Sequence, residues 1–203
     1  AKLLTALLGW AKPIQIELSE RKILRADSIF VIEALVFFAG AICHLTGPTR
    51  IGDLCWAIVA SSLGVRLWKI YRLPRHRGIM PMTLWISTLF VVLGLWALTV
   101  LPNLRIHMIH FIYIGGMALM TLLVATRVVL SHGGHSLELE LKSRPLSGLA
   151  ILFFVAAAMR ALAPLISGSN YMATIAIAGL MLSSGLLLWG ITFLSKILQK
   201  SSA

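Results

Sequence analysis

Six histidines are the residues with the clearest capacity for chemistry in this chain, because 59% of its 203 residues are hydrophobic. His107 and His110 are three residues apart, so on a helix they present neighbouring side chains at about 100° per residue. His44 is expected at the same depth on another helix. Imidazole is the commonest ligand of haem iron and also suits copper and zinc. These three histidines predict a haem or metal site, and interfacial histidines at helix ends are the alternative.

Two glycines and a fourth histidine bear on where such a site lies. Gly115 and Gly116 follow His110 by about one and a half turns, and they would let either a flat macrocycle or another helix approach. His132 would lie about 33 Å from His110 at about 1.5 Å per residue, on the same face of a regular helix. These two histidines therefore cannot form one ligand pair. His132 is expected to serve a second site or to lie in the turn that ends at His135.

Cysteines offer a second kind of metal site. Cys43 and Cys55 are expected near the outer face together with His44 and Asp53. Thiolate and imidazole suit copper, so these residues could form a mixed copper site, although a cysteine in an apolar helix often packs as a small hydrophobe. The sequence has no Cys-x-x-Cys-His motif, so a haem would be bound non-covalently, as haem b.

Carboxylates inside or near apolar segments are costly and therefore informative. Glu33 and Asp53 are of this kind, and each could bind a proton or a cation, or pair with an arginine. Arg66 is close enough to the end of its segment for its guanidinium to reach the membrane surface. The two carboxylates are the candidates for ion coupling.

Two more arginines could serve a cofactor. Arg127 and Arg160 could bind haem propionates, since guanidinium pairs well with carboxylate. That role would need a haem near the cytoplasmic side, closer to His132 than to His110. The expected ligand and the expected propionate partners therefore compete, and Arg127 could instead extend to the membrane surface.

Six long apolar segments must position these residues. Only 12% of the chain is charged and its mean hydropathy is +0.92, unlike a soluble domain. A helix needs about 20 apolar residues to cross a bilayer, and the alternation of a β-barrel strand is absent. The fold class is therefore an all-α polytopic membrane protein with about six transmembrane helices. The predicted spans are residues 28–45, 51–70, 81–101, 107–130, 145–166 and 171–194.

Basic residues predict how the spans are oriented. Several Lys or Arg residues occupy the N-terminal segment, the loops after the second and fourth spans, and the C-terminus, whereas the other loops carry few. The positive-inside rule then places both termini in the cytoplasm. Residues 1–27 are expected to form a cytoplasmic arm or an interfacial helix, 28–198 the bundle, and 199–203 a tail.

The net charge of +11 would suggest nucleic acid in a soluble protein. Here the basic residues lie in predicted loops, so the expected surroundings are a lipid bilayer, and nucleic acid is not an expected partner. The chain has no P-loop, dinucleotide fingerprint, zinc-protease helix or nucleophile elbow. Hydrolase and kinase functions therefore lack support.

The fourth span and its continuation resemble the NnrS family. The segment from His110 to His135 reads HFIYIGGMALMTLLVATRVVLSHGGH. The positions that fall where the family pattern has them are His110, Gly115, Met120, Thr121, Thr126, Arg127, His132 and Gly134. Ser143-Arg144-Pro145-Leu146 and Met159-Arg160-Ala161-Leu162 look like the next span of that family.

This resemblance implies a haem- and copper-associated protein of the bacterial inner membrane, linked to nitric oxide metabolism, without implying a settled reaction. It covers about residues 80–165 with some specificity. Ser131, Gly133 and His135 depart from the family pattern, and the third span lacks an expected histidine. The family typically has about twice this length and about twelve spans. One haem or copper site of the family could therefore be missing, rearranged or completed by another chain. The sequence also has no initiator Met, so the chain could be trimmed or a fragment of a longer one.

Three functions follow from these features. The first is a haem-binding protein, with iron held by His110 and by His44 or His107, and linked to nitric oxide metabolism or electron transfer. The second is a non-enzymatic anchor or accessory subunit, covered by partner subunits or by further copies of itself. The third is a small transporter that uses Glu33 and Asp53.

Overall fold

The computed structural model describes residues 20–76, 78–133, 136, 138–166 and 170–198, and over these residues its regular elements are all helices. The expected N-terminal arm up to residue 19, the expected tail and His135 lie outside these residues. The helices are α2 (Glu20–Thr46), α3 (Thr49–Leu63), α4 (Ile79–Val100), α5 (Arg105–His110), α6 (Leu119–His132), α7 (Glu138–Lys142), α8 (Arg144–Leu162), α9 (Asn170–Trp189) and α10 (Ser195–Leu198).

Six of the described helical stretches are long and apolar enough to cross a membrane, as the sequence predicted. Their bounds are Ser28–Thr46, Thr49–Trp68, Ile79–Val100, Pro102–His132, Arg144–Leu165 and Asn170–Leu194. The predicted bounds agree within two residues, except that the fourth stretch begins five residues early, at Pro102. A proline fits the first turn of a helix, because the N–H that it lacks would have no partner there.

Local chemistry explains several helix ends. Ser143 accepts a hydrogen bond from the backbone N–H of Leu146, and Pro145 lies in the first turn, so α8 begins with a capped N-terminus. The second span ends at Lys69, which has φ +49° and a left-handed backbone. The N–H of Ile70 then bonds to the carbonyl of Gly64 at 3.0 Å. These are ordinary start and stop signals of helices.

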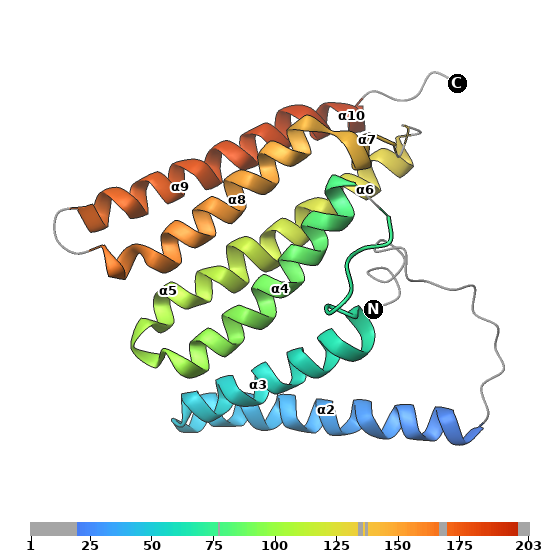
Figure 1. The fold of residues 1–203 in the computed structure, drawn as a ribbon, viewed down its shortest axis with the longest axis vertical. Helices are drawn as coiled ribbons and strands as arrows, with labels where there is room; N and C mark the ends of the chain where they lie inside the picture. The colour runs from blue at the N-terminus through green and yellow to red at the C-terminus, as the bar shows by residue number, and fades with distance from the viewer. Residues whose placement is uncertain (1–19, 77, 134–135, 137, 167–169, 199–203) are drawn as a thin grey trace.

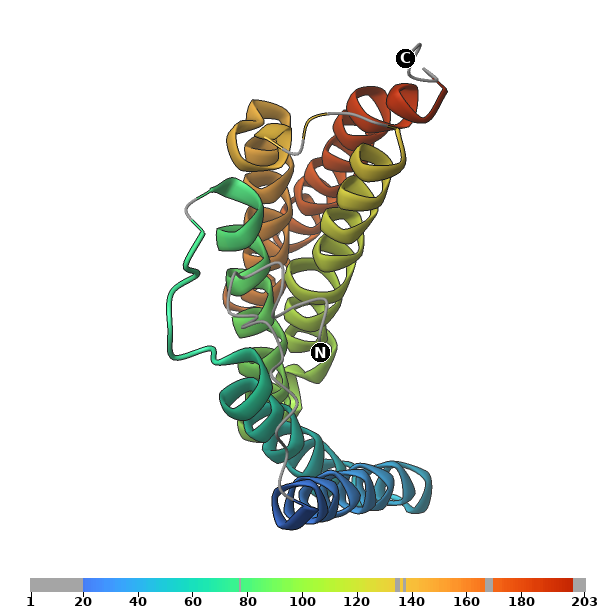
Figure 2. The same cartoon turned by 90° about the vertical axis from the view of Figure 1, so that its right-hand side faces the viewer.

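The spans follow one another through the molecule in chain order, with α2 and α9 on opposite sides (Figures 1 and 2). Helix α2 packs on α3, α3 on α4, α4 on the α5–α6 span, and α8 between that span and α9. One end carries the 69–76 loop, α7 and α10 and is called the basic end. The other end carries the α2–α3 and α4–α5 turns and is called the far end.

The core lies among the last four spans rather than in the α2–α3 hairpin. Its main cluster takes buried side chains from α4, α6 and α8, and from the turn after α9, where Phe193 is 2% exposed. A smaller cluster at the far end unites Leu98, Met108, Ile112 and Ala161. In contrast, only 11% of the most apolar stretch of α2 is buried within the chain. In a membrane, such exposed apolar faces are compatible with contact to lipid.

The fourth span is not a regular α-helix. Residues Phe111–Ala118 are wound as a π-helix between α5 and α6. Because π winding uses i→i+5 hydrogen bonds, the 100° step that placed His110 and His132 on one face does not hold across it. Hydropathy and spacing did not predict this change, and π-helical turns occur frequently at functional sites.

The end of α9 is joined to α6 by one hydrogen bond that makes a testable prediction. The indole N–H of Trp189 donates to Thr126 Oγ1 at 2.8 Å, and Thr126 is fully buried. We expect Trp189→Phe to lower the free energy of unfolding by about 0.6–1 kcal/mol, the usual range for an interhelical bond in a membrane. Denaturant titration followed by circular dichroism measures this change. Thr126→Ser keeps the hydroxyl and should lose less, and equal losses would contradict the assignment.

Candidate functional site

An ion cluster ties the first hairpin to the fourth span at the far end. The carboxylate of Asp53 is 1% exposed and forms an ion pair with Arg105 at the start of α5. Its other oxygen lies 3.3 Å from Nε2 of His44 on α2. The indole ring of Trp56 lies beside the His44 ring, with centroids 4.3 Å apart. One buried carboxylate thus links residues of three helices.

Small residues explain how α2 and α3 come close enough for this contact. A Cβ added to Gly52 would lie 2.7 Å from the carbonyl oxygen of Gly40 and 2.8 Å from Nε2 of His44. Real Cβ atoms essentially never approach this closely, so only glycine fits there. Small residues at helix contacts are the usual means of close packing in membranes. The two glycines, Gly40 and Gly52, therefore let α2 and α3 approach closely, and this approach brings the His44 imidazole to the Asp53 carboxylate.

A second cluster at the far end brings His107 and His110 to Arg160, which lies near the end of α8. The guanidinium Nε–H of Arg160 donates to Nε2 of His110 at 3.2 Å. His107 Nδ1 lies 3.3 Å from the carbonyl oxygen of Arg160, and its ring meets the edge of Tyr171 at 5.9 Å between centroids. The structure thus joins α5, α8 and α9 around two imidazoles.

These contacts determine which nitrogen of His110 carries the proton. His110 Nδ1 lies 2.6 Å from the carbonyl oxygen of Ile106, and a carbonyl only accepts, so Nδ1 is the donor. Nε2 receives the Arg160 bond and therefore carries the lone pair. His107 is arranged in the same way, with Nδ1 directed at a backbone carbonyl. This arrangement presents Nε2 as a possible metal ligand.

Arg160 differs from the other arginines near buried carboxylates. Arg66 pairs with Glu33, Arg105 with Asp53 and Arg127 with Glu140, whereas Arg160 pairs with no carboxylate of the described residues. Its Nη1 is buried and has no hydrogen-bond partner there. A buried donor without a partner is costly, and the rest of the Arg160 side chain is partly buried. The guanidinium is therefore suited to an anionic group.

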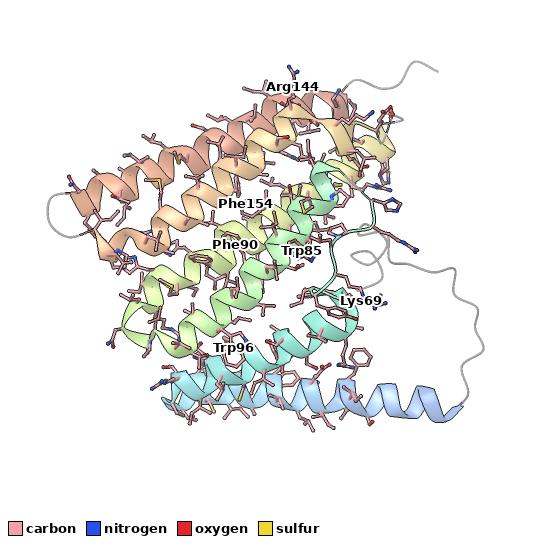
Figure 3. All side chains as sticks on the ribbon, in the orientation of Figure 1. Lys69, Trp85, Phe90, Trp96, Arg144 and Phe154 are labelled. Atoms are coloured by element: carbon pink, nitrogen blue, oxygen red, sulfur yellow. The ribbon has the colours of Figure 1, made fainter. Side chains whose placement is uncertain are left out.

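The glycine pair of the fourth span serves helix packing. A Cβ added to Gly116 would lie 2.5 Å from Cγ2 of Val91, and one added to Gly115 would overlap the Phe90 ring. Phe90 stacks on Phe154 of α8, with centroids 4.9 Å apart (Figure 3). The sequence allowed either a flat macrocycle or another helix to approach this glycine pair, and the structure shows a helix there, α4.

At the basic end, Arg127 and His132 lie apart from the histidine cluster. Arg127 donates to Glu140 Oε2 at 2.6 Å, and this carboxylate, on α7, is 2% exposed. His132 is exposed, and its Nδ1 lies 3.0 Å from the carbonyl oxygen of Val128. We expected Arg127 and Arg160 to serve one haem near this end. The structure instead places Arg160 beside His110. One haem at the far end could therefore contact both His110 and Arg160, whereas Arg127 lies too far along the molecule to serve it.

The carboxylate of Glu33 lies in a polar contact between α2 and the second span. Glu33 is 8% exposed, forms an ion pair with Arg66, and accepts a hydrogen bond from Ser62. The Arg66 guanidinium also lies 5.2 Å from the centroid of the Phe30 ring. Glu33 thus has a cationic and a hydroxyl partner on the second span.

The two cysteines do not form a metal site with other ligands among the described residues. Cys43 and Cys55 are unoxidised and partly buried. Across the part of the chain that the structure describes, no three side chains of His, Cys, Asp or Glu gather where they could hold a metal ion. His44 is brought instead to the carboxylate of Asp53.

Sequence reasoning missed two charged residues of these clusters, Arg105 and Glu140, and also their neutral members Trp56, Ser62 and Tyr171. The two charged residues are partners of charged residues that it did single out, Asp53 and Arg127. The sequence signal that could have found these two is the scarcity of acidic residues, because the chain has only 7 Asp and Glu against 18 Lys and Arg. A charge inside an apolar span seeks an opposite charge at its own depth.

Comparison with known proteins gives one match. The family model described as NnrS protein matches residues 5–201, nearly the whole chain. Searches of the curated proteins and of the solved structures found no match. The likeness that the sequence showed over residues 80–165 thus extends to α2 and α3 on one side and to α9 on the other. The chain belongs to the NnrS family, a membership that fits a membrane protein related to nitric oxide.

Proposed function

We propose that this chain is a haem-binding protein of the bacterial inner membrane, with both termini cytoplasmic, that acts in nitric oxide metabolism or electron transfer. The observation that carries the proposal is the His110 imidazole, whose Nδ1 is held by a backbone carbonyl and whose Nε2 lone pair faces Arg160. The NnrS family is associated with metals in general, and membership of it supports the proposal.

The residues at the far end fit the chemistry of a haem b. His110 would supply a neutral imidazole to the iron, and the guanidinium of Arg160, which meets no carboxylate in the part of the chain that the structure describes, suits a propionate. His107 has the same tautomer and is the nearer candidate for a second ligand, whereas His44 is engaged with Asp53. Bound haem would supply one-electron chemistry or a site for nitric oxide, and the pocket would decide between them.

Copper has weaker support from the described residues. A site built from Cys43, Cys55 and His44 would need these side chains to move together, because they do not form a group able to hold a metal. Metal analysis of the purified protein measures copper directly. Copper therefore stays a secondary proposal beside haem.

The absorption spectrum of the purified protein tests the haem proposal. We expect a Soret band that shifts on reduction and disappears in His110→Ala, because the variant lacks the imidazole ligand. His132→Ala is the matched control, since His132 also bonds to the carbonyl four residues before it but is exposed at the basic end. A folded, colourless wild-type preparation from cells supplied with haem would overturn the proposal.

The same experiment bears on an accessory subunit. The observation that favours this second function is the arrangement of the spans, in which α2 and α9 lie on opposite sides (Figure 1). Only 11% and 17% of the most apolar stretches of the first and last spans are buried within the chain. Such exposed apolar faces suit either lipid or partner subunits. A colourless preparation that co-purifies with another membrane protein would support it.

A coupled transporter has the least support. A coupling carboxylate must gain and lose its ion during transport, whereas Glu33 and Asp53 each contact an arginine. Charges inside an apolar span are usually paired with an opposite charge in this way. These contacts favour a structural role for both carboxylates.

A further inference from the structure

The contact between His110 and Arg160 in the far-end cluster limits which form of metal can bind there. A metal on Nε2 of His110 would have to replace the Nε–H of Arg160, which occupies that lone pair at 3.2 Å. The two cannot be present together, because Nε2 has only one lone pair. Any ligation by His110 therefore requires Arg160 to move.

The charge of Arg160 determines what makes that movement favourable. A divalent cation at Nε2 would lie within a few ångströms of a guanidinium that has no carboxylate partner among the described residues. Coulomb repulsion at such a distance is strong in a poorly screened site. An anionic group has the opposite effect, because it gives the buried Nη1 of Arg160 the partner that it lacks.

We infer that the cluster accepts a metal only as an anionic complex, such as a metalloporphyrin with carboxylate side chains, and excludes the bare divalent cation. Arg160 is then a residue that determines specificity: it occupies His110 until a carboxylate draws the guanidinium away. This inference rests on the proposed function in its choice of cofactor, but its first test requires no haem.

The first test measures Cu²⁺ binding to haem-free protein in a buffer without carboxylates. We expect wild-type protein to show little binding at His110, and R160Q to bind Cu²⁺ at least about tenfold more tightly, since it loses the repelling charge. The gain should vanish in the double variant R160Q/H110A. Copper bound by nitrogen ligands is recognised by its electron paramagnetic resonance spectrum.

Two further variants separate charge from shape. R144Q removes the same charge from an exposed position at the first turn of α8 (Figure 3), so it should gain no Cu²⁺. R160K keeps the charge but loses the planar guanidinium, and it should also exclude Cu²⁺. Wild-type protein that binds Cu²⁺ through His110 as tightly as R160Q does would overturn the inference, as would an equal gain in R160K.

The second test compares haem with its dimethyl ester, which lacks the two carboxylates. Wild-type protein should bind haem at least about tenfold more tightly than the ester, whereas R160Q should bind the two within about twofold. Equal binding by wild-type protein would overturn the inference while leaving haem binding intact. If neither porphyrin binds, the haem proposal fails, and the Cu²⁺ measurement still decides whether Arg160 excludes bare cations.

Discussion

Asp53→Asn should destabilise the protein by about 2–4 kcal/mol, because it leaves the positive charge of Arg105 in a partly buried site without its anion. Asp53 is 1% exposed and contacts both Arg105 and His44. Asparagine has nearly the same size, so the change removes the charge without opening a cavity. Arg105 is a third exposed, which keeps the expected loss at the lower part of the usual range for a buried pair.

The measurement is the midpoint of unfolding in a denaturing detergent, followed by circular dichroism. Glu138→Gln is the matched control, because the Glu138–Lys142 pair on α7 has the same chemistry at an exposed position. The hydrogen bond from Lys142 lowers the pKa of Glu138. The small stabilisation that follows is present above the ordinary pKa of a glutamate and is lost as the pH falls through the lowered value.

A double-mutant cycle checks that the loss comes from the ion pair itself. If Asp53 and Arg105 act on each other, the double variant D53N/R105Q should lose less stability than the two single variants lose together. Equal midpoints for wild-type protein and D53N would show that the far-end ion cluster contributes nothing to the joining of α2, α3 and α5.

Gly115→Ala should cost about 1–3 kcal/mol, the usual cost of adding a methyl group to a fully packed position. The added Cβ would lie 2.7 Å from Cε1 of Phe90. Phe90 cannot turn aside easily, because its ring stacks on Phe111 at 5.1 Å and on Phe154 at 4.9 Å between centroids. The expected result is a lower unfolding midpoint, with the helices α4 and α8 displaced from the π-helical turn.

Gly179→Ala is the control for this prediction, since a Cβ at Gly179 on α9 meets nothing within 4 Å. That variant should be as stable as wild-type protein or slightly more stable, because alanine favours a helix over glycine. A second substitution, Phe90→Leu, should restore part of the stability lost in G115A by making room for the methyl group. An unchanged midpoint in G115A would mean that the fourth span approaches α4 less closely than the structure shows.

The approach of Gly115 to Phe90 also shows what a glycine in a sequence can and cannot indicate. Gly115 and Gly116 signalled close approach by something, because a missing side chain leaves room. Whether a cofactor or another helix filled that room depended on the rotation of α4, and α4 presents Phe90 and Val91 there. Nothing within the fourth span encodes that rotation.

The sequence alone determined the number and bounds of the spans, because crossing a bilayer is a local requirement. A span must contain about 20 apolar residues whose backbone groups bond within the same segment, and each stretch met that condition by itself. The same reasoning failed at residues 111–118, where the hydrogen-bond pattern changes to a π-helix without a change in hydropathy.

Tertiary structure alone decided which charges and imidazoles meet. Asp53 pairs with Arg105 across 52 residues, and Arg160 reaches His110 across 50. Composition indicated that buried charges need partners, but depth and rotation of separate helices select them, and both depend on packing at every interface. His110 and Arg160 were therefore both visible in the sequence as separate candidates, whereas their contact became visible only in the fold.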